Sequence, residues 1–314
     1  MDVSVVIPVF RTSETILAEL CRRVRDTLLA SGHPACEIVL VDDSGEIRQW
    51  AAIKSIQSKI PGCRGLRLGR NYGQHNALLA GIRAARGNIV VTMDDDLQNP
   101  PEEIPKLLSA LSPEIDVVYG LPATRAHASW RNWGAAALKA ILATAMGQKT
   151  AAMVSPFRAF RQELRQGFEG YNGPDVMIDV LLNWSTSRFT AVTVDHHARR
   201  EGCSGYSLRR LLRLAATLVV GFSALPLRLS SIAGFVMAFF GFGLLVFVVG
   251  RYFLSNVHVP GFTFLASLIA IFSGVQMVAL GIVGEYLARM HFRSQGRPSY
   301  FIRERTPDDR DLSS

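Results

Sequence analysis

The sequence predicts an α/β protein with a doubly wound sheet, followed by an amphipathic segment and two membrane-spanning helices. Apolar, β-branched runs alternate with segments of helical periodicity through the first part of the 314 residues. Acidic residues follow two of these runs, at 42–43 and 94–96, which is where ligands bind in doubly wound sheets. The runs 229–250 and 261–284 carry no charge, and each is long enough to cross the roughly 30 Å hydrocarbon layer as a helix.

The first predicted strands and helix lie at the N-terminus. Residues 4–9 read as a buried strand, and 14–30 show apolar residues at helical spacing. A second strand at 37–41 runs directly into Asp42 and Asp43. These carboxylates fit contacts to a ribose or a base, but Asp-Ser-Gly is also a common turn, so both interpretations stay open.

A polar loop bounded by glycines, residues 69–76, separates a short third strand at 65–68 from a helix predicted over 77–85. The N-terminus of a helix attracts anions, so this loop fits an approach to a diphosphate. A plain helix start explains the same local sequence equally well.

The acidic motif Asp94-Asp95-Asp96 follows a fourth predicted strand at 89–92. Adjacent carboxylates repel one another, so their position at the end of a buried strand predicts a divalent cation held against phosphates. Acids also favour the start of a helix, and the alternative is an acidic turn that caps the helix beginning at 101.

Basic residues gather in two later segments. A helix predicted over 129–145 carries Arg131 and a lysine within two turns of it, which fits either a phosphate clamp or a solvated basic face. A strand predicted over 190–194 is followed by a glycine-containing loop with Arg200 and Ser204, which is typical of a lid over phosphates.

The net charge of +8 is concentrated beside the apolar runs, because residues 1–198 carry +1 and residues 199–314 carry +7. The positive-inside rule then places the large domain and both termini in the cytoplasm, and the hairpin 251–260 outside. Anionic lipid head groups explain juxtamembrane arginines better than nucleic acid does, and the amphipathic segment 207–221 is expected on the membrane surface. Four scattered cysteines and no signal-peptide pattern fit a reduced compartment.

Several motifs, in this order, resemble the membrane-bound family-2 glycosyltransferases that load sugars onto polyprenyl phosphates. They are residues 4–8, 42–43, 71–75, 94–105, 196–199, 284–289 and 297–301. The resemblance runs over nearly the whole chain. It implies a Rossmann-like GT-A fold, a nucleotide-sugar donor, a polyprenyl phosphate acceptor, Mg²⁺ or Mn²⁺, inversion at the anomeric carbon, and a homotetramer in the inner (plasma) membrane.

With the residue patterns above, the chain is expected to divide into a GT-A catalytic domain, a juxtamembrane amphipathic helix, a transmembrane hairpin and a cytoplasmic basic tail. Their expected bounds are 1–205, 206–228, 229–288 and 289–314. The matching motifs imply four groups of site residues: catalytic Asp94, Asp96 and Arg158; nucleotide-binding Pro8, Asp42, Asp43, Asn71 and Asp94; acceptor-phosphate-binding Arg125, Arg131, Arg200 and Ser204; and metal ligands Asp94, Asp96 and Gln98. Asp95 occupies the variable place between the paired acids, so alanine there is expected to be tolerated.

One departure from the resemblance concerns residues 150–155, where the relatives usually carry an acid and this chain has none. A lipid phosphate has a second pKa of about 6, so it is largely dianionic at neutral pH and can attack without a base. Two alternatives remain, a processive polysaccharide synthase and a non-catalytic, membrane-anchored nucleotide-sugar binder. The segment 208–212 lacks the tryptophan of such synthases, and retention of all three aspartates disfavours the inactive binder.

Overall fold

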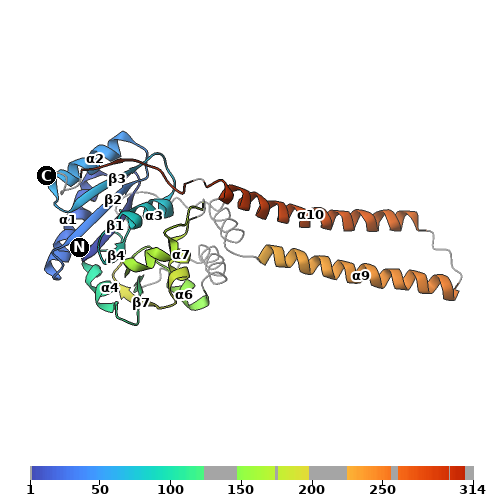
Figure 1. The fold of residues 1–314 in the computed structure, drawn as a ribbon. Coiled ribbons are helices and arrows are strands. Elements are labelled where there is room, and N and C mark those ends of the chain that lie inside the picture. Colours follow the sequence, from blue (N-terminus) through green and yellow to red (C-terminus); the bar gives the residue numbers. More distant parts are fainter. Residues whose placement is uncertain are drawn as a thin grey trace. The chain divides into compact units, whose positions relative to one another are not determined.

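The computed structural model describes residues 2–123, 147–173, 176–197, 225–255, 261–296 and 298–307. The chain forms two compact units, Met1–Ser207 together with Arg297–Ser314, and Leu208–Gly296. The first unit is an α/β domain, and the described part of the second contains two long helices (Figure 1).

Strands and helices alternate in the N-terminal part of the α/β unit, as the sequence predicts. The elements are β1 (Val3–Val9), α1 (Glu14–Ala30), β2 (Cys36–Asp42), α2 (Ile47–Lys59), β3 (Cys63–Leu68), α3 (Gln74–Ala84), β4 (Ile89–Thr92), η1 (Pro101–Glu103) and α4 (Ile104–Ala110). The helix predicted over 14–30 is confirmed. α3 begins earlier than predicted, because Gly73 adopts a φ of 92° that turns the polar loop directly into the helix.

The later part of the α/β unit is less regular. Its elements are β5 (Val117–Pro122), α6 (Gln148–Met153), β6 (Arg158–Arg161), η2 (Gln162–Phe168), α7 (Ile178–Ser185), β7 (Phe189–Val194) and β8 (Ile302–Arg305). The predictions of a helix over 129–145 and an amphipathic segment over 207–221 concern residues outside the described ranges.

The described strands form an eight-stranded sheet in the order β7-β5-β6-β4-β1-β2-β3-β8. β1 lies inside the sheet and pairs in parallel with β2 and β4, so that Val6 lies opposite Val39 and Thr92. β6 is antiparallel to both β4 and β5, and β8 is antiparallel to β3. The carboxyl ends of β1, β2 and β4 therefore meet at one edge of the sheet.

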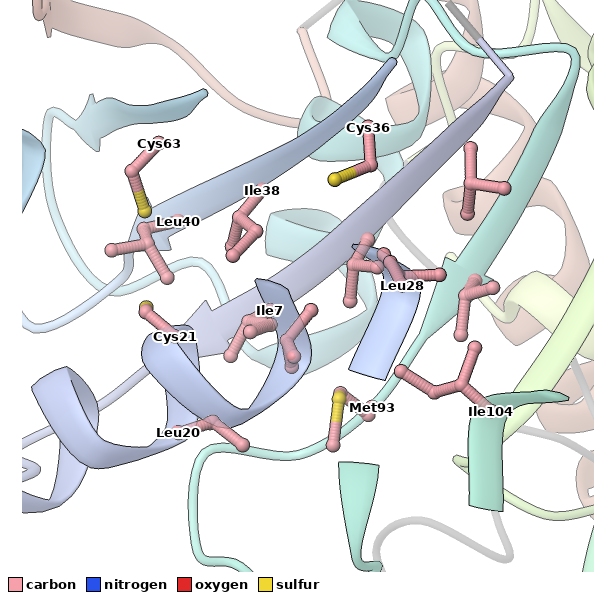
Figure 2. Close-up of a cluster of buried hydrophobic side chains, with 14 of the residues drawn as sticks. Ile7, Leu20, Cys21, Leu28, Cys36, Ile38, Leu40, Cys63, Met93 and Ile104 are labelled. Carbon is pink, nitrogen blue, oxygen red and sulfur yellow. The ribbon is translucent and has the colours of Figure 1, made fainter. Parts of the chain in front are cut away.

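Helices cover both faces of the sheet, and β1 and β2 are buried along their whole length. On one face, Ile7 and Ile38 belong to a cluster that includes side chains of α1, α2 and α4 (Figure 2). On the other face, Val6 and Val39 pack with residues of α3 and α7. Gly81 allows α3 to approach closely, since a Cβ there would lie 2.3 Å from Cγ1 of Val6.

The segment 298–307 belongs to the α/β unit, although its sequence predicts a basic tail. Its strand β8 pairs with β3, and the backbone N–H of Gly69 donates to the carbonyl of Phe301 at 2.9 Å. Thr306 accepts a hydrogen bond from the Gly65 N–H at 2.8 Å and donates its own N–H to the Gly65 carbonyl at 3.0 Å. The segment therefore covers what would be an open edge of the sheet beside β3.

The second unit contains α9 (Leu225–Ser255) and α10 (Phe262–Ser294), which lie side by side (Figure 1). Within the described residues, Ile271–Ala288 of α10 is long and apolar enough to cross a membrane, with a mean hydropathy of 1.5 and no buried positions. The described apolar stretch of α9, Ser230–Gly243, is shorter. One predicted span thus coincides with a suitable helix, and the second stays a prediction.

Candidate active site

The candidate site lies where the carboxyl ends of three parallel strands meet. Pro8 is buried near the end of β1, Asp42 ends β2, and Asp94 lies two residues beyond the end of β4. Because β1 pairs in parallel with both neighbours, these residues come to the same edge of the sheet. This is the edge at which doubly wound sheets bind nucleotides.

Asp42 and Asp43 differ in how their carboxylates are used. The Oδ1 atom of Asp42 accepts hydrogen bonds from the N–H and hydroxyl of Ser44, at 2.9 and 2.6 Å. Its buried Oδ2 atom has no hydrogen-bond partner among the described residues. Burial also raises the pKa of Asp42. An unsatisfied buried acceptor at the end of a strand is the kind of atom that a bound hydroxyl or N–H group satisfies.

Asp43 instead holds the glycine-bounded loop. Its two carboxylate oxygens accept the backbone N–H groups of Tyr72 at 2.7 Å and Gly73 at 2.9 Å. Asn71, a predicted nucleotide contact, directly precedes these residues and is exposed. Burial raises the pKa of Asp43 from its ordinary 3.8 to about 6, although the two N–H groups favour the charged form.

Each carboxylate of the acidic motif contacts a different part of the domain. The side-chain amide of Gln74, at the start of α3, donates to Asp94 at 2.6 Å. Asp95 accepts hydrogen bonds from the Phe10 N–H at 3.1 Å and from the Thr12 hydroxyl, both of which follow β1.

Asp96 receives the backbone N–H of Gln98 at 3.1 Å, which closes a turn within the motif's own loop. Leu97, inside that turn, is 4 % exposed and adopts a φ of 57°, an uncommon conformation for a residue with a side chain. The turn therefore depends on its surroundings to stay in place.

The donor set fits a hard divalent cation that is shared with phosphates. No group of three or more histidine, cysteine or acidic side chains is gathered as a complete metal site in the described part of the chain. Mg²⁺ commonly takes only one or two protein carboxylates and completes its shell with water and substrate phosphates. Asp94 and Asp96, with Gln98 next in the same loop, are the residues that could hold such a cation at the site edge.

Arg158 lies beneath the strand ends rather than at the surface of the site. It starts β6 opposite Thr92 of β4, is 1 % exposed, and donates to the Thr92 hydroxyl at 3.1 Å. It also forms a buried ion pair with Asp179 of α7, which accepts the Tyr119 hydroxyl at 2.9 Å. The family resemblance implies Arg158 among the reacting groups, whereas the structure encloses it among these partners.

Several predicted phosphate contacts cannot be placed. Arg125, Arg131, Arg200 and Ser204 lie outside the described residues. The chain that leads to the last two is described as far as His197, whose backbone N–H donates to the carbonyl of Gln98 at 2.8 Å.

No individual role for Thr12, Gln74 or Asp179 is predicted from the sequence, although Gln74 lies in the polar loop 69–76. Asp179 carried a visible signal, because a carboxylate inside the apolar run 176–182 requires a buried partner. Thr12 and Gln74 contact acids that lie far along the chain, and no local pattern reports such contacts.

Comparison with known proteins agrees with this architecture. The fold and site define an α/β domain with acidic residues at the carboxyl ends of its parallel strands, and the pattern of glycosyl transferase family 2 matches residues 4–168. The chain belongs to this family and is a glycosyltransferase. It is 37 % identical over 307 residues, 96 % of its length and 89 % of the relative's, to undecaprenyl-phosphate 4-deoxy-4-formamido-L-arabinose transferase of Pseudomonas aeruginosa. The protein of that name in Sodalis glossinidius is 34 % identical, with 96 % of this chain and 92 % of the relative covered.

Solved structures support the GT-A, Rossmann-like core. Mannosyl-3-phosphoglycerate synthase from Rubrobacter xylanophilus superimposes with a TM-score of 0.51 at 18 % identity, covering 74 % of this chain and 75 % of that one. Glucosyl-3-phosphoglycerate synthase from Mycobacterium tuberculosis gives a TM-score of 0.50 at 18 % identity, with 70 and 77 % covered. At these identities the likeness concerns the fold alone.

The hydrogen bonds of Asp95 revise the expectation that alanine is tolerated there. Asp95→Ala removes acceptors from the Phe10 N–H and the Thr12 hydroxyl, so we expect a loss of about 1–3 kcal/mol of stability. The check is the thermal midpoint of the full chain in detergent, beside Asp26→Ala, whose side chain is exposed on α1. An Asp95→Ala midpoint equal to that of Asp26→Ala would contradict this role.

The raised pKa of Asp43 predicts a pH dependence of stability. The folded protein binds a proton between about pH 4 and 6 that the unfolded chain does not, so raising the pH through this window removes stability. Asp43→Asn has no such titration. We therefore expect the thermal midpoint of the wild type, measured relative to that of Asp43→Asn, to fall as the pH rises from 4 to 7. A difference that stays constant would show that Asp43 titrates normally.

Proposed function

We propose that this glycosyltransferase transfers a sugar from a nucleotide-sugar donor to a polyprenyl phosphate, giving a lipid-linked monosaccharide. The observation that carries the proposal is the near full-length similarity to transferases whose names specify undecaprenyl phosphate as acceptor. The partial oxygen set at the end of β4 and the apolar stretch Ile271–Ala288 agree with a charged donor and a lipid acceptor.

The donor nucleotide is assigned to the edge formed by Pro8, Asp42, Asp43 and Asn71. The unpartnered Oδ2 atom of Asp42 supports a contact to the nucleoside. Asp43 holds the loop in front of α3, which brings backbone N–H groups near the start of a helix to this edge.

The diphosphate is assigned to the acidic motif together with Mg²⁺ or Mn²⁺, which Asp94, Asp96 and Gln98 would hold. When bound, the cation neutralises the charge that develops on the departing nucleoside diphosphate. The protein's own contribution is to fix the two carboxylates through Gln74 and the turn at Gln98.

The acceptor phosphate is assigned to Arg125, Arg131, Arg200 and Ser204. One guanidinium group can donate two parallel hydrogen bonds to two oxygens of the same phosphate. Arg158 acts as a positioning residue, because it is 1 % exposed and is paired with Asp179. Its hydrogen bond to the Thr92 hydroxyl supports the end of β4.

The reaction is a single displacement with inversion. A phosphate oxygen of the acceptor forms a bond to the anomeric carbon while the bond from that carbon to the nucleoside diphosphate breaks, and the electron pair leaves with the diphosphate. A dianionic phosphate has no proton to lose at this oxygen, so the step needs no general base. This accounts for activity without an acid at residues 150–155.

Membrane attachment through α9 and α10 keeps the isoprenyl chain in lipid while its phosphate reaches the α/β domain. Arginines lie on both sides of the two apolar runs, which favours a cytoplasmic location for the α/β domain and for both termini. The protein is then a multi-pass protein of the inner membrane. The segment 206–228 is assigned to the membrane surface, and the homotetramer rests on the family resemblance.

The test is a donor screen with the full chain in detergent, Mn²⁺ and undecaprenyl phosphate. The donors are a panel of labelled nucleotide sugars that includes the nucleotide-linked form of 4-deoxy-4-formamido-L-arabinose. We expect one lipid-linked monosaccharide. Asp96→Ala should lower its formation by at least about 10³-fold, because the charge on the leaving diphosphate loses its compensation. Asp26→Ala, which changes an exposed acid on α1, serves as the matched control.

Other outcomes separate the alternatives. Polymer in place of a monosaccharide would identify a processive synthase, and nucleotide binding without any product would identify a non-catalytic binder. Unchanged turnover of Asp96→Ala would overturn the assignment of the cation to this motif.

A further inference from the structure

The segment 298–307 brings a charged side chain to β3, although it lies far from that strand along the chain. Its strand β8 pairs with β3, and Glu304 lies opposite Arg67 in this pairing. The Nη1 atom of Arg67 donates a hydrogen bond to Oε1 of Glu304 at 3.3 Å. β3 ends at Leu68, directly before the polar loop 69–76. The ion pair therefore lies close to the edge of the sheet assigned to the donor nucleotide.

Arg67 in turn lies next to Asp42, one of the residues assigned to the donor nucleotide. The two residues are register partners in the parallel pair of β2 and β3. Side chains at paired positions of neighbouring strands lie on the same face of a sheet. Burial raises the pKa of Asp42, while the hydrogen bonds from Ser44 and the charge of Arg67 oppose that rise. Glu304, Arg67 and Asp42 thus occupy neighbouring positions on three adjacent strands.

Arg67 and Asp42 each keep one buried polar atom without a partner. Arg67 is 7 % exposed, and its Nε atom has no hydrogen-bond partner among the described residues. The Oδ2 atom of the buried Asp42 is in the same position. Buried polar atoms without partners are uncommon in folded proteins. A donor and an acceptor left open on neighbouring strands therefore point to a ligand that carries both kinds of group, as a nucleoside does.

The contact with Glu304 orients Arg67 more than it stabilises the fold. The Glu304 side chain is 45 % exposed, and ion pairs with an exposed partner contribute little to stability because water competes for them. The contact uses Nη1 of Arg67 and leaves Nε without a partner. It therefore restrains the guanidinium group without occupying the donor that lies open.

Hydrogen bonds on both sides of Glu304 hold the segment in place. The hydroxyl of the buried Ser299 donates to the carbonyl of Gly173 at 2.8 Å. The buried Thr306 forms two hydrogen bonds with the backbone of Gly65. None of these bonds involves the side chain of Glu304, so a substitution at residue 304 leaves them intact.

We propose that Glu304 is a positioning residue for the donor nucleotide, acting through Arg67 beside Asp42. The long side chain of arginine has many rotamers, and the contact with Glu304 restricts them before the nucleotide binds. Loss of this contact weakens nucleotide binding and leaves the acceptor site unchanged. The inference rests on the proposed function, because that function assigns the donor nucleotide to the edge that contains Asp42.

The test is calorimetric titration of UDP, GDP and CDP with Mn²⁺ into the full chain in detergent, for the wild type and Glu304→Ala. We expect the variant to bind the preferred diphosphate about fivefold more weakly. Its thermal midpoint should stay within about 2 °C of that of the wild type. Two controls should bind like the wild type: Asp26→Ala removes an exposed acid from α1, and Arg303→Ala changes an exposed neighbour in β8.

A double variant and a kinetic readout separate positioning from a general disturbance of the domain. In an Arg67→Met background, Glu304→Ala should have no further effect on affinity, because its partner is already absent. In the transfer assay, Glu304→Ala should raise the KM for the nucleotide sugar about fivefold and leave the KM for undecaprenyl phosphate unchanged.

Three results would overturn the role of Glu304: unchanged affinity in Glu304→Ala, an equal loss in Arg303→Ala, or a further loss in the Arg67→Met background. Weaker nucleotide binding by Glu304→Ala, in a protein that transfers no sugar to undecaprenyl phosphate, would instead refute the proposed acceptor and leave this role standing. A wild type that binds none of the three diphosphates would refute both.

Discussion

Adjacent carboxylates repel one another, and the site depends on how the fold offsets that repulsion at the end of β4. Asp94 accepts a hydrogen bond from the side-chain amide of Gln74, and Asp95 accepts one from a backbone N–H just after β1. Asp96 accepts a hydrogen bond from a backbone N–H of its own loop. Each acid is therefore held by a different element. The acidic motif fastens α3, the β1–α1 connection and the following turn to one another, so local structure and candidate chemistry share the same hydrogen bonds.

A buried ion pair supports the same strand ends from below. Arg158 and Asp179 are both nearly inaccessible to water, and Thr92 and Tyr119 satisfy further positions around them. Forming such a pair gains little net free energy over an apolar core, but removing one partner leaves a buried charge uncompensated. His75, which burial keeps at a lowered pKa, lies near the same pair at the start of α3. Loss of either partner is therefore expected to destabilise the packing beneath the strand ends.

The sequence was most informative where apolar periodicity and strand order act locally. The runs 4–9 and 14–30 matched β1 and α1 because burial on both sheet faces and on one helix face leaves a direct pattern. β8 was missed because three of its four residues are charged, so its sequence resembles a solvated tail. Its partner β3 also lies far away in the chain. The partners of Asp95 were missed for the same reason, since contacts between distant segments leave no local signal. Asp179, the partner of Arg158, is different, because a carboxylate inside an apolar run signals a buried partner.

The proposed function requires that the end of β4 binds a divalent cation together with a nucleoside diphosphate. Calorimetric titration of UDP, GDP and CDP into the full chain, with and without Mn²⁺, tests it most directly for the wild type and Asp96→Asn. We expect Mn²⁺ to strengthen binding of the preferred diphosphate by at least about tenfold in the wild type and to have no such effect in the variant. Equal affinity with and without Mn²⁺, or an enhancement that Asp96→Asn retains, would contradict this requirement.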